Sequence, residues 1–176
     1  MDKNERNEKI ELYGRGYDLL KAILSEVPQE AMKFKPAPTE WSVHEIIIHI
    51  ADSESNAALR ARKLIVEPGS TLMGYDQDAW ADTLNYHDHN LEDALEITKL
   101  ARKTTYELLK RQPDEVFTHS IIHPEYEAPY TFEKWINLYS AHIPGHIEQI
   151  KNVTAQRCNA RRCGRAEALP QCMEVR

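Results

Sequence analysis

Residues 131–155, TFEKWINLYSAHIPGHIEQIKNVTA, carry apolar side chains at helical spacing, with two histidines among them. At about 100° per residue, His146 falls about 40° from His142 on a helical wheel, in the same stripe as Trp135 and Ile143. Charged side chains fall on the opposite arc: Glu133, Lys134, Glu148 and Lys151. The stretch therefore predicts an amphipathic helix whose buried face carries two imidazoles.

Pro144 and Gly145 lie between the two histidines. A proline inside a helix removes one hydrogen bond and crowds the carbonyl four residues earlier, here that of Ser140, at a cost of ~3 kcal/mol. A metal bound by both flanking histidines can offset this cost, because structural zinc sites contribute ~10 kcal/mol or more. We therefore expect the helix to continue through Pro144 with a bend.

Three more stretches have helical periodicity: residues 5–27, a segment from Ser42 to about Ile65, and residues 91–111. Ser42 and Glu45 form the pattern of a capping box. Four amphipathic helices of this length predict an all-α four-helix bundle over residues 1–156. The connections 66–90 and 112–130 are long, which is typical of crossovers or of loops that cover a site.

The composition is that of a soluble domain, with 41% hydrophobic and 28% charged residues in 176. No apolar run is long enough for a membrane span. The first nine residues, MDKNERNEK, lack the apolar stretch of a signal peptide. These features predict a cytoplasmic protein without a membrane partner.

Charge is distributed unevenly. From Arg157 onward there are five arginines and two acidic residues, a net charge of +3, which leaves 17 basic and 26 acidic residues, a net charge of −9, for the rest. An acidic body argues against nucleic-acid binding, which needs a basic face.

All three cysteines, Cys158, Cys163 and Cys172, also lie near the C-terminus. The chemistry of residues 1–157 must therefore use histidines, carboxylates, hydroxyls or an imported group. Residues 157–176 show no periodicity, and we expect them to be a disordered extension or a non-native C-terminal tail.

The two histidines of the last helix are candidate metal ligands, because side chains four residues apart reach a common point. Without a metal or a shared proton, each buried imidazole would need a separate partner. A catalytic zinc site uses three protein ligands and one open position. His49 is the best third candidate, since it borders the apolar stripe of its helix, with Ser53, Asn56 and Arg60 on its own side.

The remaining histidines are weaker candidates. His44 lies about 140° from His49 on the wheel and is expected to face solvent. The pairs His87/His89 and His119/His123 lie in the two long connections, where no helix fixes their spacing.

The segment WSVHEIIIHIADSE (Trp41–Glu54), followed later by HIPGHIEQI (His142–Ile150), resembles the DinB superfamily. The resemblance extends over residues 5–155. It implies a four-helix bundle in up-down-down-up order with a long connection between the second and third helices, and a homodimer. It also implies that His49, His142 and His146 bind a divalent metal ion, with zinc or nickel expected. No catalytic residue is assigned.

Members of this family include metal-dependent hydrolases and thiol-dependent transferases, bacillithiol transferases among them. Three neutral imidazoles leave the metal its full charge, so a bound water can ionise near pH ~7 and a bound thiol is deprotonated. The leading hypothesis is therefore a low-molecular-weight thiol S-transferase that joins a small thiol of the bacillithiol type to an electrophilic substrate. The alternatives are a hydrolase that uses metal-bound hydroxide and a metal-stabilised dimeric bundle without catalysis.

A pocket beside an open coordination position would favour an enzyme over a scaffold. Tyr75, Trp80 and Tyr86, in the connection 66–90, are candidates for the wall of such a pocket, although packing against the bundle explains them equally well.

Overall fold

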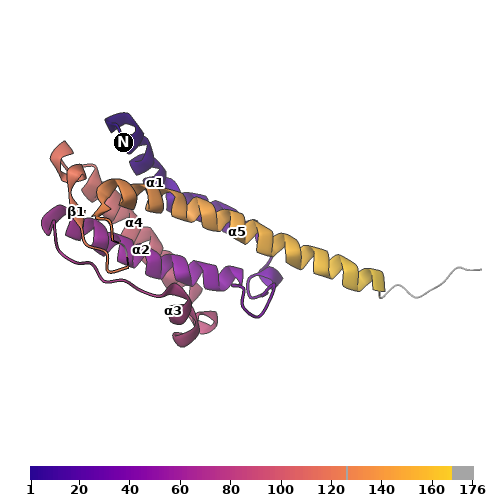
Figure 1. Ribbon diagram of the computed structural model, residues 1–176. Coiled ribbons are helices and arrows are strands. Elements are labelled where there is room, and N and C mark those ends of the chain that lie inside the picture. The colour runs from indigo at the N-terminus through magenta and orange to yellow at the C-terminus, as the bar shows by residue number, and fades with distance from the viewer. Residues whose placement is uncertain (126, 168–176) are drawn as a thin grey trace, which may run out of the picture.

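The structure, a computed structural model, describes residues 1–125 and 127–167, with side chains through Ala160. Its four long helices are α1 (Lys3–Leu24), α2 (Val43–Val66), α4 (Leu91–Leu109) and α5 (Phe132–Glu167). Figure 1 shows α1 and α5 running in one direction and α2 and α4 in the other. α2 packs against α4 and α5, and α1 packs against the same two helices. The predicted all-α bundle in up-down-down-up order is confirmed.

Side-chain caps fix where the helices begin. Asp2 accepts a hydrogen bond from the backbone N–H of Glu5 at the start of α1. The predicted capping box of Ser42 and Glu45 is present at the start of α2, with both reciprocal hydrogen bonds made. These bonds satisfy N–H groups that the first turn of a helix would otherwise leave unpaired.

The connection 66–90 contains regular structure that the sequence analysis did not predict: helix α3 (Gln77–Thr83) and the 3-10 turn η2 (Tyr86–Asp88). Asp76 caps α3 by accepting from the backbone N–H groups of Asp78 and Ala79. Tyr86 is fully buried, and its hydroxyl donates a hydrogen bond to Asp52 on α2. Tyr86 therefore anchors the end of the crossover on α2.

The connection 112–130 contains the 3-10 turn η3 (Asp114–Thr118) and two short strands. Strand β1 (Ser120–Ile121) pairs antiparallel with β2 (Tyr130–Thr131). A single bridge from Thr71 to Ile122 ties this connection to the crossover. A further 3-10 turn, η1 (Gln29–Ala31), lies between α1 and α2. The two long connections thus meet at one end of the bundle.

Helix α5 continues through Pro144, as expected, and the bend stays a prediction. Its predicted end near Ala155 is wrong, because the helix reaches Glu167. This last part extends beyond the other helices in Figure 1, and residues 156–160 are exposed except for the half-buried Arg157, so no apolar stripe marks this part of the helix. The first residues of the predicted tail are therefore helical, and residues 168–176 lie outside the described residues.

The core consists of two apolar clusters with a buried polar layer between them. Along α2 one cluster ends at Ala51 and the other begins at Ala57. Glu54 lies between them with no exposed surface, and Arg102 of α4 is 1% exposed beside it. None of the helices among the described residues has the length and apolarity to cross a membrane.

The arginine of this polar layer occupies space left by a glycine. A methyl group added to Gly16 of α1 would lie 1.5 Å from Nη1 of Arg102. Gly16→Ala should therefore lower the free energy of unfolding by ~2–3 kcal/mol, because the guanidinium must leave its ion pair or the helices must separate. Urea denaturation of the metal-free protein measures this change.

Gly145→Ala is the matched control, since no atom lies within 4 Å of the added methyl group. It should raise stability by ~0.5–1 kcal/mol, because alanine is the better helix former. A Gly16→Ala protein as stable as the wild type would contradict the packing described.

Candidate metal centre

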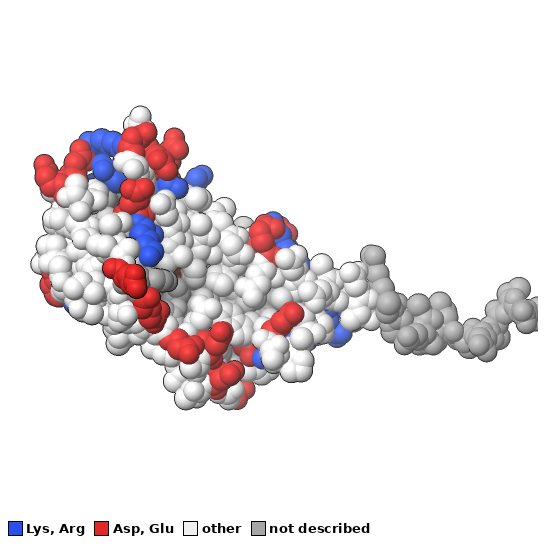
Figure 2. Space-filling model, viewed as in Figure 1, with Lys and Arg blue, Asp and Glu red and all other residues white. Residues whose placement is uncertain are grey.

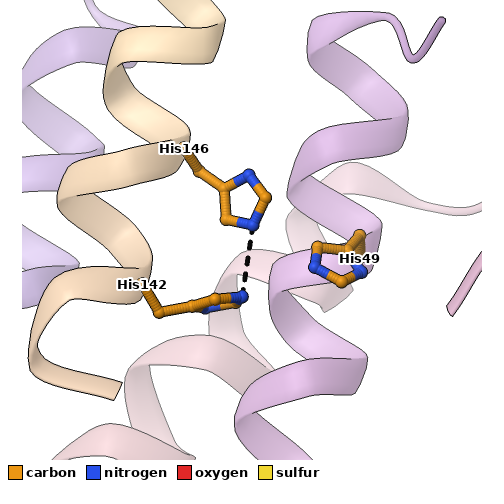
Figure 3. Close-up of side chains that lie close together, drawn as sticks. All are labelled: His49, His142 and His146. Atoms are coloured by element: carbon orange, nitrogen blue, oxygen red, sulfur yellow. Dashed lines mark hydrogen bonds between the residues drawn. The ribbon is translucent and has the colours of Figure 1, made fainter. Parts of the chain in front are cut away.

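Three imidazoles from two helices converge in the bundle. His142 and His146 lie one turn apart on α5, and His49 faces them from α2 (Figure 3). Their ligand atoms lie within 4.8 Å of one another, and within the described residues they form the one group of three His, Cys, Asp or Glu with such spacing. His49 is 1% exposed, whereas His142 and His146 are partly exposed. The predicted set of three is thus brought together.

The hydrogen bond made by His146 determines which of its ring nitrogens faces the centre. Its Nδ1 lies 2.9 Å from Oε1 of Gln149. An amide oxygen only accepts hydrogen bonds, so Nδ1 carries the proton and Nε2 carries a lone pair. Gln149 therefore holds the imidazole in the form that a metal requires.

His142 is held by a carboxylate. Its Nδ1 lies 3.7 Å from Oε1 of Glu54, and both atoms are buried without a hydrogen-bond partner within the described residues. A carboxylate can only accept from this nitrogen, so the proton belongs on Nδ1 of His142. This leaves the lone pair of His142 on Nε2 as well.

The two Nε2 atoms are 3.2 Å apart, as the dashed line in Figure 3 marks. Two lone pairs at this distance repel each other unless a positive ion or a proton lies between them. The separation also matches the edge of a tetrahedral zinc site, about 3.3 Å for Zn–N bonds of about 2.0–2.1 Å. The donor set therefore fits a divalent metal ion that His49, His142 and His146 could hold together.

Burial keeps His49 and His146 neutral. Burial and the neighbouring His146 and His142 lower the pKa of His49 from 6.5 to about 3. Burial and His142 lower the pKa of His146 to about 4. A protonated imidazole cannot bind a metal, so lowered pKa values leave these donors available at neutral pH.

Glu54 is supported from two further helices. Arg102 Nε of α4 lies 3.1 Å from Oε2 of Glu54, and the Tyr13 hydroxyl of α1 donates to the same oxygen at 3.2 Å. Burial raises the pKa of Glu54, but the charge of Arg102 and the contact with His142 outweigh this and lower it. Glu54 is therefore ionised, and its negative charge beside Nδ1 of His142 makes the opposite nitrogen, Nε2, a stronger metal ligand.

A cavity of about 860 Å³ opens beside the cluster and is lined by His142 and His146 among others. Gly145 also lines it, and the absence of a side chain there keeps the space between the two histidines open. An accessible cavity next to two half-buried donors is the arrangement that distinguishes an enzyme from a structural metal site.

The other histidines lie elsewhere. The prediction that His44 faces solvent is wrong: it is 6% exposed, and its Nε2 bonds the backbone oxygen of His89 at 2.9 Å. The crossover folds back over the start of α2 and covers it. His119 bonds the backbone oxygen of Leu64, and neither loop pair joins a three-residue cluster within the described part of the chain.

The cavity wall differs from the predicted one. Tyr86 is part of the core and the partly buried Trp80 packs against it, while the Tyr75 ring contacts that of Trp80 in a tilted arrangement with ring centroids 4.8 Å apart. The wall comes instead from α5, from Arg60 of α2 and from His123 and Tyr130 of the connection 112–130. Glu54, Gln149 and Arg60 were not predicted as site residues from the sequence, although Arg60 was placed on the same side of its helix as His49. Helical spacing from the histidines is the one signal that could have indicated them.

Comparison with known proteins agrees with this arrangement. The family model of the DinB superfamily matches residues 12–150. The chain therefore belongs to the DinB superfamily.

Among its relatives is YfiT of Bacillus subtilis (strain 168), named as a proposed metal-dependent hydrolase. It is 25% identical over 143 residues, which cover 75% of this chain and 80% of that protein. A protein of Oceanobacillus iheyensis with the same description is 27% identical over 137 residues, with 77% of each chain covered.

Two solved structures share the fold. The YfiT structure has a TM-score of 0.82 at 20% identity, and the superposition covers 89% of this chain and 90% of the YfiT chain. A mycothiol-dependent maleylpyruvate isomerase has a TM-score of 0.66 at 10% identity, and the superposition covers 82% of this chain and 60% of the isomerase chain.

The lowered pKa values predict how acid affects the metal-free protein. In the unfolded chain, His49 and His146 become protonated as the pH falls below about 6.5. In the folded chain, they become protonated only near pH 3–4, because their pKa values are lowered. The unfolded state therefore binds more protons in this window, so stability is complete above about pH 6.5 and is lost as the pH falls. His49 alone should contribute about 1–2 kcal/mol of this loss by pH 5.

Urea denaturation at pH 7 and pH 5 measures this effect. The wild type and His89→Gln, whose side chain is exposed outside the cluster, should lose stability alike, and His49→Gln should lose less. Equal losses in all three proteins would show that His49 is protonated in the folded state.

Proposed function

We propose that His49, His142 and His146 bind one divalent metal ion, zinc or nickel, and that the protein is a metal-dependent S-transferase for a low-molecular-weight thiol. The observation that carries the proposal is the pair of Nε2 lone pairs held 3.2 Å apart beside a large open cavity. The names of the relatives, proposed metal-dependent hydrolases, support the metal.

A metal ion at this position supplies positive charge that favours the ionised form of a thiol or a water molecule. The protein groups hold the donors in place for it. Glu54 and Gln149 orient the rings of His142 and His146, and the Ser53 hydroxyl lies 3.3 Å from Nε2 of His142. His49 closes the buried side, with Trp41 stacked on its ring at 4.7 Å. The remaining open side faces the cavity.

A thiol cosubstrate is favoured because residues 1–157 contain no cysteine, so a sulfur nucleophile has to come from outside the bundle. A structural neighbour is named for its dependence on mycothiol, a small thiol. Hydrolysis with water as nucleophile is the second candidate, because the relatives bear that description. Both reactions use the same three histidines, so cosubstrate dependence is what separates them.

The homodimer that the family resemblance implies, the cytoplasmic location and the division into a bundle of residues 1–156 and a tail stay predictions.

The proposal is tested with metal-loaded protein, a monohalogenated bimane as electrophile, and bacillithiol, glutathione or cysteine in turn. One of these thiols should form a C–S bond to the bimane as its carbon–halogen bond breaks, with release of halide and of the thiol proton to water, at a rate that depends on both metal and protein. His142→Ala should lose stoichiometric metal, measured by elemental analysis, and with it the reaction. His119→Ala, which changes a histidine outside the cluster, should keep both.

Cleavage of ester or amide substrates in water, without acceleration by any thiol, would overturn the transferase and favour the hydrolase. Bound metal without either reaction would favour the non-catalytic bundle. Full metal content in His142→Ala would contradict the three-histidine site.

A further inference from the structure

Arg60 lies on the same face of α2 as His49, and Ser53 and Asn56 lie between them. Its Nη1 donates a hydrogen bond to the Tyr139 hydroxyl at 3.1 Å, and the Tyr139 ring lies 6.0 Å from that of His142, measured between centroids. One aromatic ring therefore separates the guanidinium from the metal centre. Arg60 also lines the cavity that opens beside His142 and His146.

This arginine is buried without a counter-charge. It is 8% exposed, and none of the ion pairs between described residues includes it. Its bonded acceptors, the Tyr139 hydroxyl and the backbone oxygen of Met73, are both neutral, and its Nε has no partner. A buried charge is costly unless it is paired, as Arg102 is with Glu54. The cost indicates that Arg60 has a partner outside the chain.

Arg60 and Lys134 are the basic residues among the described residues that line this cavity, and His123 lines it as well. The acidic residue of the same lining, Glu133, pairs with the N-terminal ammonium of Met1 at 3.2 Å. Burial and the charges of Arg60 and Lys134 lower the pKa of His123 despite the opposing charge of Glu125.

The rest of the molecule is not positive: the chain has a net charge of −6, and acidic side chains dominate the face in Figure 2. A cavity with an unpaired cation inside an acidic protein favours an anion in that cavity rather than on the surface.

We propose that Arg60 is a binding residue for a carboxylate group of the small molecule that occupies the cavity. A carboxylate matches the planar guanidinium and would supply the missing counter-charge. This proposal rests on the proposed function, because it takes the cavity to be the substrate site of the transferase. Glutathione, cysteine and bacillithiol all carry carboxylates, so the thiol itself can be the molecule that Arg60 recognises.

The first experiment needs neither metal nor thiol. Hexanoate and hexanamide differ in charge but hardly in shape, and their affinities for metal-free protein are measured by ligand-observed NMR titration. The wild type should bind hexanoate about tenfold more tightly, the effect of one hydrogen bond to a charged group. In Arg60→Gln the two affinities should become equal within twofold.

Arg62→Gln is the matched control. Arg62 lies on the same helix, bonds Ala58 and Thr105 and does not line this cavity, so its variant should keep the preference for hexanoate. Thermal unfolding checks that each variant is folded. If Arg60→Gln does not fold, Arg60→Lys replaces it: this variant keeps the charge but not the planar fork, and it should reduce the preference.

The second experiment compares N-acetylcysteine with N-acetylcysteamine, which lacks the carboxylate, on metal-loaded protein by calorimetry. The wild type should favour the carboxylate thiol, and Arg60→Gln should not. If neither thiol binds but hexanoate is still preferred in an Arg60-dependent manner, the thiol transferase fails and the carboxylate site stands. Equal affinities for hexanoate and hexanamide in the wild type, or a preference unchanged in the tested Arg60 variant, would overturn the carboxylate site.

Discussion

The fully buried carboxylate of Glu54 is the contact that joins the four long helices. From α2 it meets Tyr13 of α1, Arg102 of α4 and His142 of α5. An ionised group at this depth is tolerated only with all its partners in place, and removal of one partner from such a pair costs ~3–5 kcal/mol. Apolar clusters on either side can repack with small losses, whereas this layer fixes how the helices are aligned along their axes. The same contact orients His142, so fold and site share one constraint.

The sequence predicts the parts of the structure that follow from spacing along one helix. Apolar periodicity predicts the four helices, and the separation of four residues places His142 and His146 on one face. The capping box at Ser42 predicts where α2 begins. His49 was found because it borders the apolar stripe of its own helix.

The rest depends on contacts between segments that spacing does not encode. Nothing in the pattern pairs Glu54 with Arg102, because they lie on different helices and each looks like an ordinary charged residue. His44 is buried only because the crossover returns to cover it. The sequence of the last turns of α5 shows no apolar periodicity, and these turns extend beyond the other helices (Figure 1).

We propose that His49, His142 and His146 form one metal centre, in which burial keeps His49 and His146 neutral and Glu54 and Gln149 orient His142 and His146. X-ray absorption at the zinc K-edge of zinc-loaded protein tests it most directly. Three imidazole nitrogens are expected at about 2.0–2.1 Å from zinc in the wild type. Two imidazole nitrogens are expected in His49→Gln, because the other two donors lie together on α5 and stay in place. A spectrum with one imidazole or none, or one that is identical in His49→Gln, would contradict it.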